Sequence, residues 1–407
     1  MEKPKIRFKG YQEDWEQRKL GEVCSEIGDG LHSAPEYDDN GNFYFINGNN
    51  LINGHIVINS KETKRVSEKT FEKNNKQLDD NTVLLSINGT IGNLAYYQGE
   101  PVMLGKSAAY LKANKIDKTF LYSLLQTTAV MNNFMLSLTG TTIKNLGLDA
   151  IKNTKISIPE LHEQKKIGLY FSQLDNLITL HQRKCEEMKT LKKYMLQKMF
   201  PQNGQSVPQI RFSGFTEDWE QRKLEDYLEV SSEKNRDELF GKEDVLSVSG
   251  EVGIVNQIEF QGRSFAGASV ANYGIVEVGD VVYTKSPLKS NPYGIIKTNK
   301  GKTGIVSTLY AVYKPKENVD SEFVQIYFES DFRMNSYMHP LVNKGAKNDM
   351  KVSDANALKG PVFFPKIEEQ IAISQYFNSL DHLITLHQQK CDELRNIKKF
   401  MLQNMFI

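Results

Sequence analysis

The octapeptide Glu13-Asp-Trp-Glu-Gln-Arg-Lys-Leu20 returns unchanged as Glu217-Asp-Trp-Glu-Gln-Arg-Lys-Leu224. The match extends outward, so that 13 of 17 positions are identical between residues 4–20 and 208–224. A second pair of segments follows, in which residues 159–200 match residues 365–406 at 24 of 42 positions. Repetition on this scale indicates one structural unit that is used twice in a single chain.

The segments between the repeated blocks are nearly equal in length, with 138 residues in 21–158 and 140 in 225–364. They share little sequence identity but have the same order of predicted elements. Each has a strand-like run after a turn, a Lys-bearing loop, a second strand-like run and then a helical stretch. The strand-like runs are Asp80–Ser86, Ala108–Ala113, Asp280–Lys285 and Thr308–Lys314, and the helical stretches are Thr119–Leu136 and Ser321–Met338. We therefore expect two similarly folded inserts whose different surfaces recognise different things.

The second repeated block predicts a pair of long helices. Its apolar or small residues alternate in steps of four and three, which is the heptad seam of a coiled coil. Pro159 and Pro365 precede the two seams, where proline is tolerated at the start of a helix. The first seam is Ile167, Phe171, Leu174, Ile178, His181, Cys185, Met188, Lys192, Met195 and Met199, and the second is Ile373, Phe377, Leu380, Ile384, His387, Cys391, Leu394, Lys398, Met401 and Met405.

Because an insert must span back between the two seams, antiparallel pairing is the natural topology. The predicted fold class is α+β, with two globular mixed α/β domains separated by a long antiparallel two-helix coiled coil and related by a pseudo-two-fold repeat. The predicted boundaries are 1–158 for the first domain, 159–203 for the first helix and linker, 204–364 for the second domain and 365–407 for the second helix.

The seam residues His181, His387, Cys185 and Cys391 admit two interpretations. They fit a metal or redox cluster, or packing residues that fix the register of the helices. The second interpretation is favoured, because His-x3-Cys is not a common zinc spacing and no further ligands lie nearby.

Composition excludes several functional classes. The 407 residues carry 51 Lys plus Arg against 50 Asp plus Glu, so the chain is not a generally basic nucleic-acid wrapper. Three cysteines without CxxC spacing exclude a disulfide scaffold. The chain has no apolar run long enough to span a membrane and no secretory signal, and we expect it in the cytoplasm.

Catalytic motifs are missing. Gly301-Lys-Thr303 resembles the end of a phosphate-binding loop, but position 296 is Ile where such a loop requires Gly. Asn291-Pro-Tyr-Gly294 lacks the second proline of an adenine methyltransferase motif, and no Gly-rich loop for a methyl donor lies upstream. No metal site is predicted. The chain is therefore expected to bind a partner rather than to be an enzyme.

Local lysine clusters favour DNA as that partner. Seven lysines and no acid lie between Lys285 and Lys316, and both inserts contain polar, Gly-rich loops whose Asn, Thr and Lys tips suit base edges. A solvated lysine face is the alternative. The predicted DNA-binding residues are Ser86, Asn88, Thr90, Lys106, Thr141, Thr142, Lys144, Lys285, Lys289, Lys297, Lys300, Lys302, Lys347 and Asn348.

The complete layout resembles a known family. The matching stretches are Asp14–Glu22 with its copy Asp218–Asp226, Pro159-x3-Glu-Gln164-x2-Ile167 with Pro365-x3-Glu-Gln370-x2-Ile373, Leu174-Asp-x-Leu-Ile178 with Leu380-Asp-x-Leu-Ile384, Ser86-x3-Thr90-Ile-Gly92 and Thr139-Gly-Thr-Thr-Ile143. Together, over essentially the whole length, they resemble the DNA-specificity subunit of type I restriction–modification systems. The second insert departs from the pattern in its loops from Lys285 to Lys302 and at Gly345-Ala-Lys347.

The resemblance implies a non-catalytic subunit. Each insert would be a target-recognition domain that reads one half of a bipartite, asymmetric DNA site, and the helices would set the spacer. Two modification subunits would methylate adenine at N6 with S-adenosylmethionine, and two restriction subunits would use ATP and Mg. Candidate docking or coiled-coil residues are Leu174, Leu177, Ile178, Leu180, Leu380, Leu383, Ile384 and Leu386, together with Leu191 and Leu196. The alternative is a coiled-coil scaffold that presents two protein-binding heads.

Overall fold

The computed structural model describes residues 3–142, 144–202, 204–287, 291–344 and 350–407. Its contacts divide the chain into two compact units. Unit 1 runs to Gln182 and also contains Gln388–Ile407, and unit 2 is Arg183–His387. The four consecutive segments expected from the sequence are therefore redistributed, because each unit combines one globular insert with parts of both long helices.

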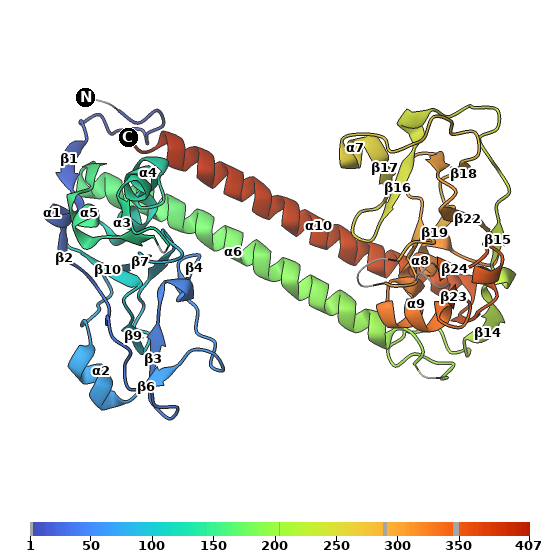
Figure 1. The fold of residues 1–407 in the computed structure, drawn as a ribbon, viewed down its shortest axis with the longest axis horizontal. Coiled ribbons are helices and arrows are strands. Elements are labelled where there is room, and N and C mark those ends of the chain that lie inside the picture. The colour runs from blue at the N-terminus through green and yellow to red at the C-terminus, as the bar shows by residue number, and fades with distance from the viewer. Residues whose placement is uncertain (1–2, 143, 203, 288–290, 345–349) are drawn as a thin grey trace. The chain divides into compact units, whose positions relative to one another are not determined.

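Unit 1 is built on a four-stranded antiparallel sheet with the order β2-β10-β7-β8 (Figure 1). The central strand β7 is buried along its whole length, which explains its run of Val and Leu. These strands are β2 (Cys24–Asp29), β7 (Thr82–Ser86), β8 (Leu94–Tyr96) and β10 (Ala108–Ala113), and the helices of the insert are α1 (Leu20–Val23), α2 (Glu68–Asn74), α3 (Lys118–Leu124), α4 (Thr128–Leu136) and α5 (Leu148–Asn153).

A second group of strands forms a smaller core in unit 1. Its three-stranded sheet has the order β6-β3-β9, with β3 and β9 parallel. The members are β3 (Phe43–Ile46), β6 (Arg65–Val66) and β9 (Val102–Leu104), and two short antiparallel pairs follow, β4 (Leu51–Ile52) with β5 (His55–Ile56) and β11 (Leu138–Thr139) with β12 (Asn145–Leu146).

Unit 2 repeats the main sheet in the order β15-β22-β19-β20. Its other strands differ in their pairing from those of unit 1, so the two inserts share the main sheet but not the smaller strand pairs that we expected to be similar. The strands are β15 (Leu228–Val230), β16 (Leu246–Ser249), β17 (Gly253–Asn256), β18 (Gly274–Val276), β19 (Val281–Thr284), β20 (Ile296–Thr298), β21 (Gly304–Val306), β22 (Tyr310–Pro315), β23 (Asn343–Lys344) and β24 (Met350–Lys351), and the helices are α7 (Gln257–Gln261), α8 (Ser321–Phe328) and α9 (Asp331–Met338).

The repeated octapeptide closes each insert. In unit 1 it forms β1 (Glu16–Lys19), which pairs with β13 (Lys155–Ile158) directly before the first long helix. In unit 2 it forms β14 (Glu220–Lys223), which pairs with β25 (Pro361–Phe364) before the second. The adjoining Trp15 and Trp219 are buried, whereas the residues of β1 and β14 are exposed.

The two long helices are α6 (Leu161–Lys198) and α10 (Ile367–Asn404) (Figure 1). They pack antiparallel inside each unit. In unit 1, Lys398 Nζ lies 2.6 Å from Asp175 Oδ1 and Cys391 Sγ lies 3.6 Å from the Ile178 carbonyl oxygen. In unit 2, Lys192 Nζ lies 2.7 Å from Asp381 Oδ1, so the polar position of each seam has a charged partner. The predicted antiparallel coiled coil is confirmed.

The cysteines of the seam behave as packing residues. Cys185 and Cys391 are almost fully buried, and Cys185 Sγ lies 3.9 Å from the Ile384 carbonyl oxygen. Within the described ranges, no group of three or more His, Cys, Asp or Glu side chains is arranged to hold a metal ion. No helix in the same ranges is long and apolar enough to cross a membrane.

Each long helix ends in the core of the other insert. Phe200, which follows α6, packs in unit 2 against Trp219 and Phe323, and Phe406, which follows α10, packs in unit 1 against Trp15 and Phe120. The backbone repeats this relation: Ile6 N donates to Asn404 O, and Ile210 N to Lys198 O, both at 2.9 Å. The pseudo-two-fold repeat is thus built by exchange of helix ends.

Candidate nucleic-acid interface

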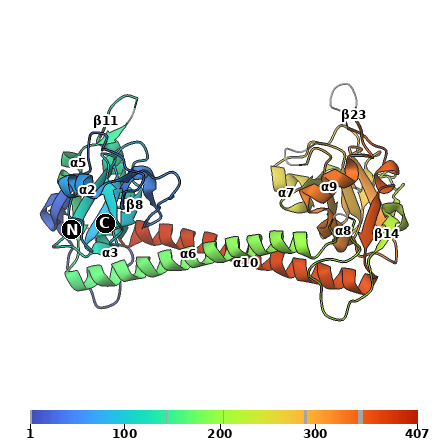
Figure 2. The same ribbon diagram turned by 90° about the horizontal axis from the view of Figure 1, so that it is seen from below.

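The structure brings two predicted loops of unit 1 together. Residues 87–92 connect β7 to β8, and residues 138–146 form the β11–β12 hairpin, which projects from the rest of the insert in Figure 2. Asn88 and Asn145 form a backbone bridge, and Leu146 N donates to Ile87 O at 2.8 Å. Loops that are more than 45 residues apart in sequence therefore form one polar surface.

Most of the predicted side chains on this surface are accessible. Thr90, Thr141, Thr142 and Lys144 are exposed and Asn88 is half-buried. Positive φ angles at Gly89, Gly92 and Gly140 let the backbone turn sharply at the tips. We call residues 87–92 together with 138–146 the unit 1 tip, Ile143 excepted.

Ser86 has a different role. Its side chain is fully buried, and its hydroxyl donates to the Thr90 carbonyl oxygen. Direct contact with DNA through Ser86 does not fit this burial. We assign Ser86 instead to holding the shape of the loop that presents Asn88 and Thr90.

The turn between β9 and β10 adds a positive charge beside the unit 1 tip. Lys106 is exposed there, and the neighbouring Ser107 Oγ accepts a hydrogen bond from Gly48 N at 2.9 Å. Asn47, Gly48, Asn49 and Asn50 thereby join the same surface through the 3₁₀ turn η1 (Gly48–Asn50). This turn was not predicted from the sequence, although a run of Asn and Gly between two strands is a recognisable turn signal.

The corresponding loop of unit 2 follows β19. Lys285 is half-buried and its Nζ lies 2.9 Å from Asp354 Oδ1, while the Tyr293 ring packs edge-on against His339 at 6.0 Å between centroids. These contacts place the loop beside the segments that flank β23 and β24, as in unit 1. Lys289, Lys347 and Asn348 lie outside the described residues.

Lys297 does not lie on this surface. It belongs to β20, its side chain is 8% exposed, and burial lowers its pKa. Burial of an ammonium group in a sheet is incompatible with a phosphate contact at the surface. The sequence did not predict this burial, because β20 is only three residues long and shows no alternation of apolar and polar residues that would identify a buried face.

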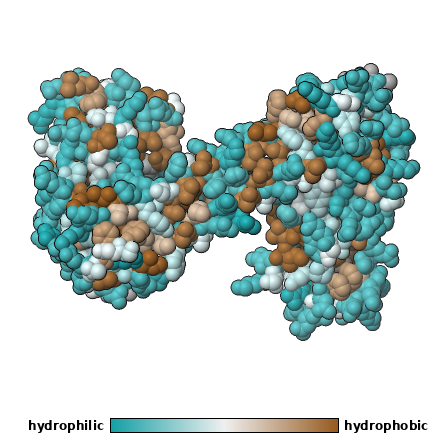
Figure 3. All heavy atoms as spheres, turned by 180° about the vertical axis from the view of Figure 1, so that it is seen from behind, coloured by the Kyte–Doolittle hydropathy of each residue, from teal (hydrophilic) through white to brown (hydrophobic). Residues whose placement is uncertain are grey.

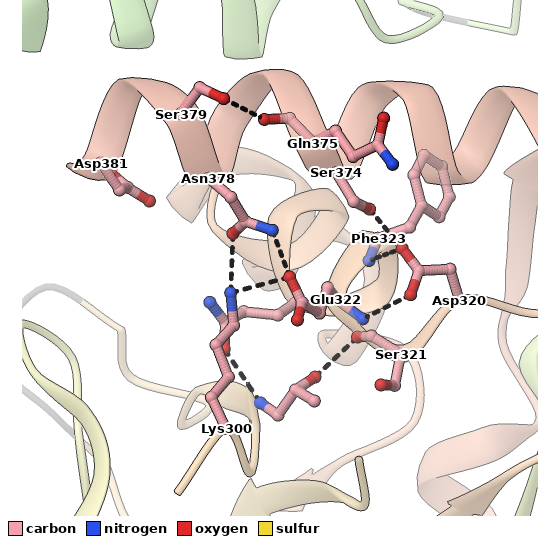
Figure 4. Close-up of polar contacts among 12 residues, drawn as sticks. Lys300, Asp320, Ser321, Glu322, Phe323, Ser374, Gln375, Asn378, Ser379 and Asp381 are labelled. Carbon is pink, nitrogen blue, oxygen red and sulfur yellow. Dashed lines mark hydrogen bonds and ion pairs between the residues drawn. The ribbon is translucent and has the colours of Figure 1, made fainter. Parts of the chain in front are cut away.

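Lys300 contacts side chains of the helices α8 and α10 (Figure 4). Its Nζ donates to Asn378 Oδ1 of α10 at 2.7 Å and pairs with Glu322 of α8 at 3.0 Å, and Asn378 also donates to Glu322. This lysine therefore ties the β20–β21 turn to two helices. Lys300 is exposed, so these contacts give it a structural role while its phosphate contact stays a prediction.

The same close-up explains the neighbouring cap. Asp320 accepts hydrogen bonds from the backbone N–H groups of Glu322 and Phe323 at the start of α8, and from Ser374 Oγ of α10 (Figure 4).

Three lysines of this loop, Lys297, Lys300 and Lys302, were predicted to contact the DNA backbone. Among them, Lys302 alone is exposed without an ion pair to another described residue. The phosphate contact of Lys302 stays a prediction.

Comparisons with known proteins support the architecture. The profile of the type I restriction modification DNA specificity domain matches residues 12–190. The putative type I restriction enzyme MjaX specificity subunit of Methanocaldococcus jannaschii is 26% identical, with 95% of this chain and 91% of that protein aligned. The MjaVIII specificity subunit of the same organism is 23% identical over the same shares.

Residues 12–190 therefore resemble the DNA specificity domain of type I restriction–modification systems, and the chain as a whole is similar to specificity subunits of such systems. The crystal structure of the type I S subunit from M. genitalium shares its fold, with a TM-score of 0.63, 16% identity and coverage of 100% of this chain and 99% of that one. A specificity subunit is the DNA-recognition component rather than the methyltransferase or the nuclease.

On the two long helices, the leucines predicted to dock partners differ in how exposed they are. Leu174, Ile178 and Leu380 are buried in the seam, and Ile384 is half-buried. Leu191 and Leu196 are half-buried against the core of unit 2. The exposed set is Leu177 and Leu180 in unit 1 and Leu383 and Leu386 in unit 2, and hydrophobic side chains emerge along the helices on the face in Figure 3.

Proposed function

We propose that this chain reads a bipartite, asymmetric DNA site, with one half-site for each unit, and directs adenine N6 methylation and cleavage by partner subunits. The observation that carries the proposal is the unit 1 tip, where loops distant in sequence converge and present exposed Thr side chains, the half-buried Asn88 and Lys144, with Lys106 on the adjoining turn. Lysines that contact phosphates set position, and polar loop tips that reach base edges set sequence.

Replacing Lys106 and Lys144 with Ala should weaken binding to all DNA sequences by a similar factor. Each lost phosphate contact should flatten the slope of log K against log salt by about 0.9 and reduce affinity roughly fivefold near 0.15 M salt. Fluorescence anisotropy with specific and random duplexes, at several salt concentrations, measures both quantities.

Lys115→Ala is the matched control for this pair, because Lys115 is exposed beyond the opposite end of β10. An unchanged salt slope in the double variant would contradict the role of the unit 1 tip. A wild-type chain that ignores DNA at low salt would instead favour a coiled-coil scaffold with two protein-binding heads.

The partner subunits of the proposal are two modification subunits, which would bind S-adenosylmethionine, and two restriction subunits, which would use ATP and Mg. We infer that the exposed leucines form one docking surface in each unit, Leu177 with Leu180 in unit 1 and Leu383 with Leu386 in unit 2. Apolar side chains exposed at helical spacing suit a helix-in-groove contact. Assembly on chromosomal DNA agrees with the expected cytoplasmic location.

The double variant Leu177→Glu and Leu180→Glu should abolish co-purification with the modification subunit, because burying two carboxylates in an apolar contact is unfavourable. The chain itself should remain folded, since both leucines are exposed. Thr179→Glu, at an exposed position between them, is the control. Retained assembly of the double variant, measured by size-exclusion chromatography, would place the docking surface elsewhere.

A further inference from the structure

The turn Asn47-Gly48-Asn49-Asn50 gathers three side-chain amides. Two of them hold the turn. Asn47 Oδ1 accepts a hydrogen bond from Ser107 Oγ at 2.9 Å. Asn50 Oδ1 accepts one from Asn47 N at 2.9 Å, and Asn50 Nδ2 donates to Val57 O at 3.0 Å. The two flanking amides are therefore committed to the structure.

Asn49 lies between these two residues and is exposed. In the part of the chain that the structure describes, its amide has no hydrogen-bond partner. The turn thus presents one free amide from a base that is fixed on both sides. The backbone that carries this amide is fixed before a ligand binds, so only the side-chain rotamers of Asn49 lose conformational entropy on binding.

The turn packs closely against Ser86, the residue that precedes the unit 1 tip. A Cβ atom at Gly48 would collide with Ser86 Oγ and with the Ser107 carbonyl oxygen, so only Gly allows this close approach. Lys106 is the neighbour of Ser107. Asn49 therefore belongs to the same surface as Thr90 and Lys106.

A hollow of about 430 Å³ opens beside Asn49. Its wall includes Tyr37 and Phe45, and Lys64 Nζ lies 4.3 Å from the centre of the Tyr37 ring. Lys64 lines this hollow together with Asn49 and Glu62, and Lys106 precedes Ser107, whose hydroxyl binds Asn47. A lysine next to a free amide suits a DNA strand whose phosphate binds Lys106 and whose base faces Asn49.

The chemistry of the amide selects the base. Phosphate oxygens only accept hydrogen bonds, whereas an amide both donates and accepts. Adenine offers the complementary pair in the major groove, because N7 accepts and N6 donates. We propose that Asn49 reads an adenine in the half-site of unit 1. The assignment rests on the proposed function and names one residue that sets its specificity.

The test uses the complex of this chain with its modification subunit, acting on a library of randomised duplexes whose methylated members are sequenced. Asn49→Ala should reduce the preference for adenine at one position of one half-site by roughly 5- to 150-fold. Asn49→Asp should shift that preference toward cytosine, since a carboxylate only accepts and cytosine N4 donates. The half-site of unit 2 should not change and serves as an internal control.

Asn114→Ala is the matched control, because Asn114 is exposed at the opposite end of β10. Unchanged preferences at every position in both Asn49 variants would overturn the assignment while leaving the proposed function intact. A wild-type complex that methylates without sequence preference would overturn the proposed function, and the Asn49 assignment with it.

Discussion

Replacing Phe200 with Ala should lower the free energy of unfolding of unit 2 by about 3–5 kcal/mol. Phe200 is fully buried and lies within 6.1 Å, between ring centres, of the rings of Trp219, Phe323 and Phe377. Arg333 also covers its ring, with Cζ 4.1 Å from the ring centre. The substitution therefore leaves a cavity in the middle of an aromatic cluster and removes the end of α6 from the core of unit 2.

The chain supplies its own reporters for this measurement. It has only two tryptophans, and each contacts the exchanged helix end of its own unit, Trp219 at 5.8 Å from Phe200 and Trp15 at 6.1 Å from Phe406. Urea unfolding of Phe200→Ala in a Trp15→Phe background, followed by fluorescence, reports unit 2 alone. Phe406→Ala in a Trp219→Phe background makes the reciprocal measurement on unit 1.

Phe332→Ala is the control for unit 2, since this ring is 69% exposed and its loss should change stability by less than about 0.5 kcal/mol. A loss below about 1 kcal/mol for Phe200→Ala would show that the end of α6 is not an essential part of the core.

Replacing Arg7 with Met should destabilise unit 1 by about 3–5 kcal/mol. Arg7 Nε and Nη2 donate to the two carboxylate oxygens of Glu163 at 2.7 and 2.8 Å, and the Glu163 side chain is fully buried. Without the guanidinium, that carboxylate would remain buried without its charge partner. Arg211 and Glu369 form the same pair in unit 2, at 2.7 Å for both hydrogen bonds.

The double variant Arg7→Met and Glu163→Leu separates burial of an unpaired charge from loss of packing. Replacing both partners with apolar side chains should restore most of the lost stability, because the desolvation cost disappears with the charge. Urea unfolding followed through Trp15 measures both variants. Arg18→Met is the matched control, since its pair with Glu16 lies at the surface and contributes about 0–1 kcal/mol. If the double variant were as unstable as the single one, the Arg7–Glu163 pair would stabilise unit 1 mainly through its packing and not through its charges.

Much of the fold could be read from local patterns. The duplication is evident from the identical sequences of the two octapeptides, and the heptad seam identifies the buried stripe of both long helices. Local periodicity determines which face of an element is apolar, so the antiparallel coiled coil followed from the sequence. The loops that form the unit 1 tip were also recognisable, because Gly and Asn mark sharp turns between strands.

The candidate site was only partly accessible to the same reasoning. Lys297 and Lys300 look equivalent in the sequence, yet one is buried in β20 and the other is bound by Glu322 and Asn378. Asn49 was overlooked, because the commitment of Asn47 and Asn50 to the turn depends on Ser107 and Val57. These outcomes depend on contacts with residues distant in sequence, and a local sequence pattern does not show which distant residues come into contact.

The sequence by itself determined that one unit is written twice, that its helices pair through a heptad seam and that its inserts differ. Only the tertiary structure decided that each helix ends in the core of the other insert, that residues 87–92 meet the hairpin 138–146, and which lysines remain free. The physical reason is that periodicity and turn chemistry act over a few residues. Burial, charge pairing and the exchange of Phe200 and Phe406 are set by packing between segments that the chain brings together only when it folds.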